Sequence, residues 1–137
     1  MGEDSVTWDN AYSVDFEPID IQHKELVTMV NVLFDACRQG ADAADKVFLQ
    51  TIKKAVVYAR NHFSDEEQYM LKASYPDLNN HRKLHDDFVA TVLKSMQEYE
   101  SGNTAPVDMA QFLKKWLLNH IAISDKQYAP YLAKLKT

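Results

Sequence analysis

The sequence predicts an all-α protein, an up-down-up-down four-helix bundle with an N-terminal arm and a short C-terminal helical turn. The 137 residues include only three glycines and four prolines, and no stretch alternates as a half-buried strand would. Instead, apolar residues recur three and four positions apart in four separate stretches, which is the pattern of an amphipathic helix. Short breaks separate these stretches, and short connections place successive helices antiparallel.

Composition limits the class of protein further. With 46% hydrophobic and 26% charged residues, the chain suits one globular domain. The net charge of −5 argues against a nucleic-acid surface. No apolar run approaches the roughly 18 residues of a membrane span, so no membrane insertion is expected. The start, MGEDSVTWDN, lacks an apolar signal segment, and the single cysteine excludes an internal disulfide. A cytoplasmic protein is the simplest interpretation.

Residues 1–18 show no helical period and are expected to form the arm. Trp8, Tyr12 and Phe16 are four apart, and Pro18 should end any helix there. We expect the arm to pack these aromatic rings on the bundle, which takes up residues 19–137. A partner-binding surface at Trp8 is the alternative.

The first two helices are expected at 19–38 and 43–72, with Gly40 between them. Asp20 is a candidate cap for the first helix. Both helices carry a histidine on the apolar stripe that should face the core. The stripes are His23, Leu26, Val27, Val30, Leu33, Phe34 and Cys37, then Phe48, Ile52, Ala55, Ala59, His62, Glu66 and Tyr69.

The third helix is expected at 77–101, and the fourth begins at Pro106, a favoured position for proline. Pro130 kinks or ends the fourth helix and leaves 131–135 as a last turn. Histidines again lie on the apolar stripes. These stripes are Leu78, His81, His85, Phe88, Val92, Met96 and Tyr99, then Met109, Phe112, Leu113, Trp116, His120 and Ile123.

The stretch 62–85 carries the strongest functional signal. His62 and Glu66 are four apart, and so are His81 and His85. Residues four apart share one face of a helix, so each pair can direct two ligands at one point. The Tyr75-Pro76 turn between the pairs makes the two helices antiparallel, with both pairs near their shared end.

The remaining candidates fall at the same level of the bundle. His23 lies 17 residues before Gly40, and His85 lies 17 residues before Gly102. His120 follows Gly102 by 18 residues, so each of these distances is roughly 25 Å of helix. Asp125 follows His120 by five. We therefore expect seven ligand side chains to converge.

A single histidine on an apolar stripe is more often an ordinary core residue than a ligand, but five with two carboxylates need a common partner. They are too many for one tetrahedral zinc and suit two metals bridged by the carboxylates. Imidazole with carboxylate fits iron, with manganese or zinc as alternatives. Ferritin-like di-iron sites use Glu-x-x-His and a majority of carboxylates. A histidine-rich set argues instead for binding dioxygen without cleaving it.

In order, the chain carries a lone histidine, His-x-x-x-Glu, His-x-x-x-His and His-x-x-x-x-Asp. This order resembles the hemerythrin family, specifically its bacterial members, over nearly the whole chain. The resemblance implies two non-haem iron ions, bridged by Glu66, Asp125 and an oxo or hydroxo group. One iron would be held by three histidines, and the other by two, with an open position for dioxygen. The three are His81, His85 and His120, and the two are His23 and His62.

Several details accompany the resemblance. The five-residue step from His120 to Asp125 requires a distorted turn, for example a π-bulge. Bacterial hemerythrins often carry glycine at the position of Asp15. Glu67 is an alternative bridge, but the apolar stripe selects Glu66. Gln22 is expected to be solvated, and Tyr128 to hydrogen-bond Asp125. The residues that match the family's dioxygen pocket are Phe63, Trp116, Leu117 and Ile123.

The resemblance implies reversible dioxygen binding for storage or delivery, without enzymatic activity. One alternative is an oxygen- or redox-sensing domain of a signalling protein. Another is a di-iron enzyme that reduces peroxide or acts as an oxidase. The partner beyond dioxygen, either a signalling protein or an oxygen-using enzyme, stays open, as does the oligomeric state.

Overall fold

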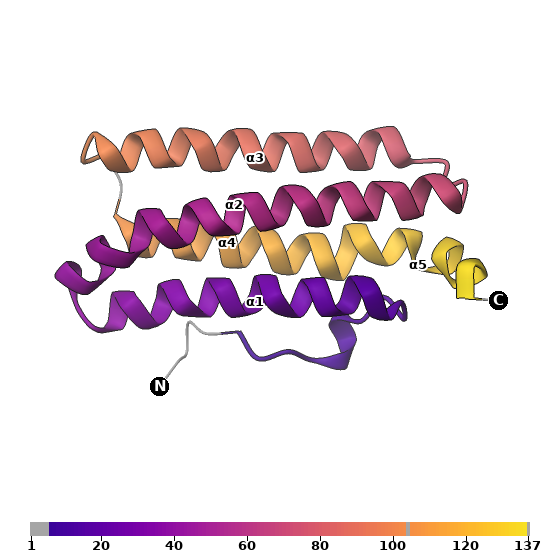
Figure 1. Ribbon diagram of the computed structural model, residues 1–137, viewed down its shortest axis with the longest axis horizontal. Coiled ribbons are helices and arrows are strands. Elements are labelled where there is room, and N and C mark those ends of the chain that lie inside the picture. The colour runs from indigo at the N-terminus through magenta and orange to yellow at the C-terminus, as the bar shows by residue number, and fades with distance from the viewer. Residues whose placement is uncertain (1–5, 104, 137) are drawn as a thin grey trace.

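The structure, a computed structural model, describes residues 6–103 and 105–136, and all of the regular structure in these residues is helical. Four long helices lie side by side with alternating direction (Figure 1), which confirms the predicted bundle. Helix α1 packs against both α2 and α4, and α2 packs against α3. The elements are η1 (Asn10–Tyr12), α1 (Glu17–Arg38), α2 (Ala41–Lys72), α3 (Leu78–Glu100), α4 (Pro106–Asn119), the π-helical η2 (His120–Asp125), α5 (Lys126–Leu132) and η3 (Ala133–Lys136).

The first helix begins at Glu17, two residues earlier than expected. Pro18 starts this helix where it was expected to end one, because the first turn of a helix needs no intrahelical partner for its N–H groups. Asp20 does not cap the helix. Its carboxylate accepts hydrogen bonds from Ser13 Oγ at 2.5 Å and from the Val14 N–H at 2.9 Å. Asp20 therefore ties the end of the arm to the first turn of α1.

The arm runs back along α1 (Figure 1). Its Val6 backbone exchanges two hydrogen bonds with the side chain of Asn31, at 2.7 and 2.8 Å. Trp8 and Tyr12 pack on the bundle core, and Phe16 lies edge-on to Tyr69 with ring centroids 4.8 Å apart. The expected packing of the aromatic rings is confirmed for these described residues, whereas residues 1–5 lie outside them.

Asp15 bends the arm into α1. Its φ of 56° lies in the left-handed region, which glycine adopts freely and aspartate tolerates better than most residues. This backbone requirement fits the expectation, taken from the resemblance, that glycine can stand at this position.

Two apolar clusters lie along the bundle axis. The larger one fills the middle and the far end and includes Phe34, Phe48 and Val92. The smaller one lies at the end with the Tyr75-Pro76 turn and includes Ile19 and Met70. The histidine-bearing level of the bundle lies between them, so apolar packing shields it from both ends.

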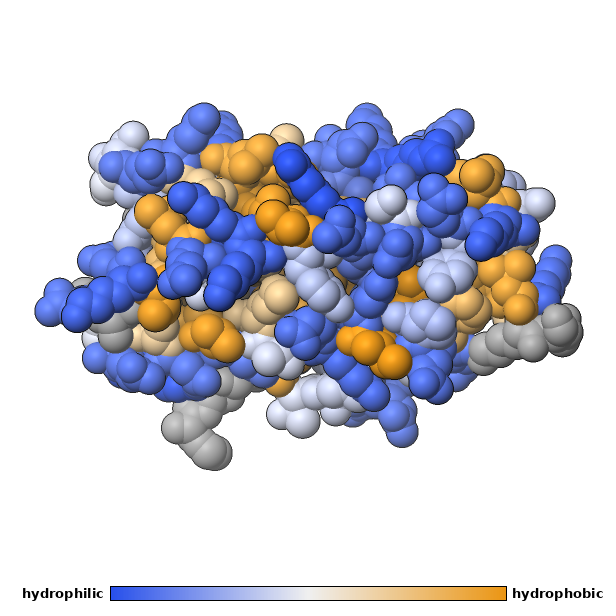
Figure 2. All heavy atoms as spheres, viewed as in Figure 1, coloured by the Kyte–Doolittle hydropathy of each residue, from blue (hydrophilic) through white to orange (hydrophobic). Residues whose placement is uncertain are grey.

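The face of the molecule drawn in Figure 2 is mainly hydrophilic. On the face drawn in Figure 2, hydrophobic residues occur in small separate groups among charged and polar ones. Among the described residues, no helix has the length and apolar character needed to cross a membrane.

The two hydrogen bonds of Asp20 should stabilise the fold. Asp20→Ala leaves the Val14 N–H and the Ser13 hydroxyl without their carboxylate, which we expect to cost about 1–3 kcal/mol. Asp9→Ala is the control, because Asp9 makes a single bond, to the Ala11 N–H, in an exposed turn. Urea unfolding should show a clearly larger loss for Asp20→Ala, and equal losses would contradict this role.

Candidate metal centre

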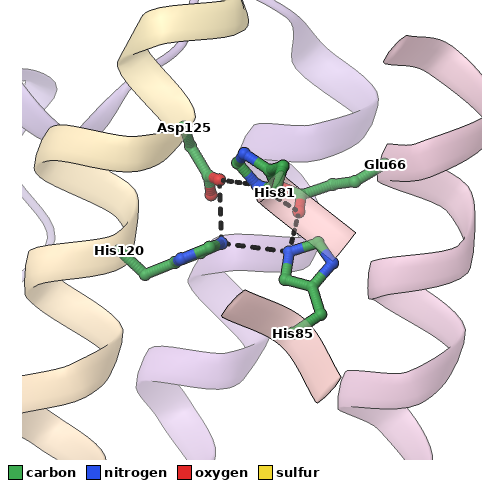
Figure 3. A group of neighbouring side chains, drawn as sticks. All are labelled: Glu66, His81, His85, His120 and Asp125. Carbon is green, nitrogen blue, oxygen red and sulfur yellow. Dashed lines mark hydrogen bonds and ion pairs between the residues drawn. The ribbon is translucent and has the colours of Figure 1, made fainter. Parts of the chain in front are cut away.

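The structure brings all seven expected ligand residues together at one level of the bundle. Each is at most 5% exposed. Figure 3 shows five of them converging on one space from α2, α3 and the two ends of η2. The seven are His23, His62, Glu66, His81, His85, His120 and Asp125.

One oxygen of each carboxylate faces the two histidines of α1 and α2. Glu66 Oε2 lies 3.3 Å from His23 Nε2 and 3.4 Å from His62 Nε2. Asp125 Oδ2 lies 2.9 Å from His23 Nε2. Ligand atoms bound at right angles to one metal, each about 2.1 Å away, are roughly 3 Å apart. These four residues therefore fit one metal position.

The other oxygen of each carboxylate faces the remaining three histidines. Glu66 Oε1 lies 3.1 Å from His85 Nε2, and Asp125 Oδ1 lies 3.0 Å from both His81 Nε2 and His120 Nε2. His85 Nε2 and His120 Nε2 are themselves 3.1 Å apart. The two groups share both carboxylates, so the arrangement offers two adjacent positions, one with three histidines and one with two.

Several polar atoms in this cluster are buried without a hydrogen-bond partner. They are Glu66 Oε1, His81 Nε2 and both oxygens of Asp125, together with His23 Nδ1. A buried polar atom without a partner costs stability, and all of these except His23 Nδ1 face the shared space. Metal ions between the two histidine groups would satisfy them, so the donor set fits a two-metal centre.

The cluster is also strongly charged. Burial alone would lower the pKa of His23, but the Asp125 and Glu66 carboxylates outweigh it and raise this pKa to about 9. The same balance raises the pKa of His81 to about 9. Burial would raise the pKa values of Glu66 and Asp125, yet the surrounding histidines hold both below their ordinary values. Without metal, protonated histidines and ionised carboxylates therefore neutralise each other.

The residues His120–Asp125 form the predicted distorted turn, a π-helix. In a π-helix the hydrogen bond closes five residues on rather than four. A five-residue step therefore returns to nearly the same face, which is why His120 and Asp125 both point inward and are buried.

The same turn corrects the prediction for Ile123. An ordinary α-helix would place Ile123 beside His120, but in the wider π-turn it points outward and is 59% exposed. Ile123 therefore does not line the pocket. Ile121 is fully buried instead and packs in the larger apolar cluster.

The other three expected pocket residues are close to the ligands. Phe63 stacks on His85, with ring centroids 3.8 Å apart and planes 7° apart. Trp116 stacks on His120 at 4.4 Å and 12°. Together with Leu117 they line an apolar cavity of about 40 Å³ between α1, α2, α3 and α4.

Polar residues outside the cluster hold the histidines in place. Gln22 was expected to be solvated, but its Oε1 lies 2.6 Å from His62 Nδ1. Glu67 is not one of the converging residues, and its Oε2 lies 2.8 Å from His85 Nδ1. Gln22 and Glu67 directly adjoin His23 and Glu66 in sequence. The neighbour of a ligand lies beside the ligand face and can contact the next helix, so this adjacency could have predicted their role.

Tyr128 is fully buried and donates a hydrogen bond to Glu66 Oε2 at 2.6 Å, not to Asp125 as expected. Burial raises its pKa well above the ordinary value, and the Asp125 and Glu66 carboxylates raise it further. The hydroxyl therefore stays protonated and holds the Glu66 carboxylate in place.

The fold and this cluster define a class: a four-helix bundle with a buried, histidine-rich, carboxylate-containing metal centre. A family model, the Hemerythrin HHE cation binding domain, matches residues 14–132. The chain belongs to the hemerythrin family.

Named relatives agree with this assignment. The chain is 35% identical to a myohemerythrin of Theromyzon tessulatum, with 88% of each chain covered. It is 32% identical to a bacteriohemerythrin of Pseudomonas paraeruginosa, covering 90% of this chain and 78% of the relative. A crystal structure of wild-type hemerythrin is similar with a TM-score of 0.79 and 30% identity, covering 93% of this chain and 98% of that one.

The π-turn makes opposite predictions for two isoleucines. Ile121→Ala should cost about 2–5 kcal/mol of unfolding free energy, because it leaves a cavity in a packed core. Ile123→Ala should change it by less than about 0.5 kcal/mol, because this side chain is exposed. Chemical denaturation of the two variants at equal metal content tests this, and equal losses would contradict the π-helical register.

The raised pKa values of His23 and His81 predict coupling between metals and protons. These two histidines are protonated at pH 7.5 in the metal-free protein, so metal uptake should release about two protons from them, in addition to any proton released when water forms a bridging hydroxide. Calorimetric titrations in buffers with different ionisation enthalpies measure this number. The release should fall as the pH rises through about 9, and a pH-independent release would contradict the assigned charges.

The raised pKa values of His23 and His81 also make the stability of the metal-free fold depend on pH. The stabilisation by protonated His23 and His81 is complete below their unfolded pKa of 6.5 and is lost as the pH rises through about 9.

Proposed function

We propose that this protein binds dioxygen reversibly at a centre of two iron ions and serves in oxygen storage or delivery. One observation carries the proposal. Both buried carboxylates divide their oxygens between a group of three histidines and a group of two. Two metals bridged by carboxylates require this sharing of oxygens. The unequal number of histidines would leave one metal with a coordination position open for dioxygen.

The ligand count favours the open position at the two-histidine metal. His81, His85 and His120, two carboxylate oxygens and a bridging oxo or hydroxo group would fill six positions of one iron. His23 and His62, with the same three bridges, would fill only five of the other. The second iron would thus have one protein ligand fewer, which would leave room for dioxygen. When bound, the two iron ions supply the electrons for its reversible reduction.

The apolar surroundings support binding over turnover. Phe63 and Trp116 cover His85 and His120, and the adjoining cavity of about 40 Å³ is lined by apolar side chains. Dioxygen is small and apolar, so it can occupy such a cavity, which carries few polar partners for water. Keeping water and protons away from a bound oxygen species would slow its irreversible loss.

The test combines metal content with reversible oxygenation. Protein made in iron-rich medium should contain two irons per chain. The anaerobically reduced protein should gain a visible charge-transfer band in air and lose it again under argon, over repeated cycles. A single metal per chain would sink the two-iron proposal. Rapid irreversible oxidation in the first cycle would sink storage or delivery and favour sensing or turnover.

A further inference from the structure

The two histidine groups are supported by unlike residues on their outer side. His85 Nδ1 lies 2.8 Å from Glu67 Oε2, a carboxylate, whereas His62 Nδ1 lies 2.6 Å from Gln22 Oε1, an amide. His85 belongs to the group of three and His62 to the group of two. One metal position is thus backed directly by a carboxylate, which is paired with Arg82, and the other by an amide.

Each supporting residue is itself held by a third one. Glu67 Oε1 accepts a hydrogen bond from Arg82 Nε at 3.3 Å. Gln22 Nε2 donates to Asp65 Oδ2 at 2.8 Å. Because Asp65 can only accept, the amide of Gln22 must turn its oxygen toward His62. In both histidines Nδ1 therefore donates to the outer partner, and Nε2 faces the centre.

We propose that Glu67 is a positioning residue that makes the two metal positions unequal, so that the three-histidine position holds its metal more tightly. A carboxylate that accepts from Nδ1–H pushes electron density toward Nε2 and strengthens it as a ligand, and an amide does so less. This inference rests on the proposed two-metal centre. It adds that charge outside the ligand set, in addition to the number of histidines, sets the order of loading.

Glu67 is accessible enough to be tested without disturbing the core. Its side chain is 22% exposed, and it lines an open groove between α2 and α3 together with His85 and Asp86. Glu67→Gln keeps the shape and one acceptor oxygen, which can still face His85 Nδ1, while it removes the charge and gives up the hydrogen bond from Arg82. Asp86→Asn is the matched control, because it removes a charge from the same groove. It leaves in place the contact between His85 Nδ1 and Glu67.

A second variant moves the charge to the other position. The double substitution Gln22→Glu, Asp65→Asn places a carboxylate against His62 and keeps a donor beside it, with no change in net charge. It should strengthen the two-histidine position. Damage to the fold cannot produce this result, because damage weakens metal binding.

The experiment uses cobalt(II) as the probe, added to metal-free protein and then withdrawn by excess chelator while the visible spectrum is followed. The parent should bind two cobalt ions and release them in two phases. His62→Ala, which removes a ligand from the two-histidine group, identifies the phase of that position. Glu67→Gln should accelerate the other phase on the order of 10–100-fold. The Gln22→Glu, Asp65→Asn variant should slow the His62 phase, and Asp86→Asn should move neither.

Failure of the role of Glu67 can be distinguished from failure of the two-metal centre. Binding of one cobalt ion by the parent would overturn the two-metal centre. Binding of two, with release phases that Glu67→Gln leaves unchanged or that Asp86→Asn moves equally, would overturn the role of Glu67 while the two-metal centre stands.

Discussion

The structure depends on two carboxylates buried in the middle of the bundle. Glu66 and Asp125 are fully buried, and each has one oxygen toward each group of histidines. Burying ionised carboxylates costs several kcal/mol unless opposite charges or metals compensate them. Helices α1, α2 and α3 and the segment η2, which continues α4, contribute the histidines at this level, so the compensation requires all four parts of the bundle to be in place. The centre therefore acts as a cross-link as well as a site.

The rest of the chain makes this arrangement possible. Two apolar clusters lie on either side of the polar level and exclude water from it. The π-turn His120–Asp125 allows one segment to supply both a histidine and a carboxylate. Tyr128 enters from α5, in the cluster at the end of the bundle, and holds Glu66 with its hydroxyl. Apolar packing alone would not need these features, so they are explained by the centre.

The sequence predicted the bundle and the convergence of the seven residues, because both follow from helical periodicity and counting along an axis. It failed where the outcome depends on a local departure from α-helix or on a neighbouring helix. Ile123 was misplaced because an α-helical angle was applied to a π-turn. Gln22 was expected to be solvated, and Tyr128 was given the wrong partner. Both side chains contact another helix, which the pattern of a single helix cannot reveal. Asp20 was expected as a cap because the start of the helix at Glu17 was not anticipated.

The charges explain how such a site can stay folded when metal is absent. The two carboxylates keep depressed pKa values, while those of His23 and His81 rise to about 9. In the metal-free state, protons on these histidines supply the positive charge that metals would otherwise supply. Metal entry is then an exchange of cations within a prepared cavity and needs no creation of charge in an apolar core. Because protonated His23 and His81 can balance the two carboxylates, loss of metal does not leave uncompensated negative charge in the core.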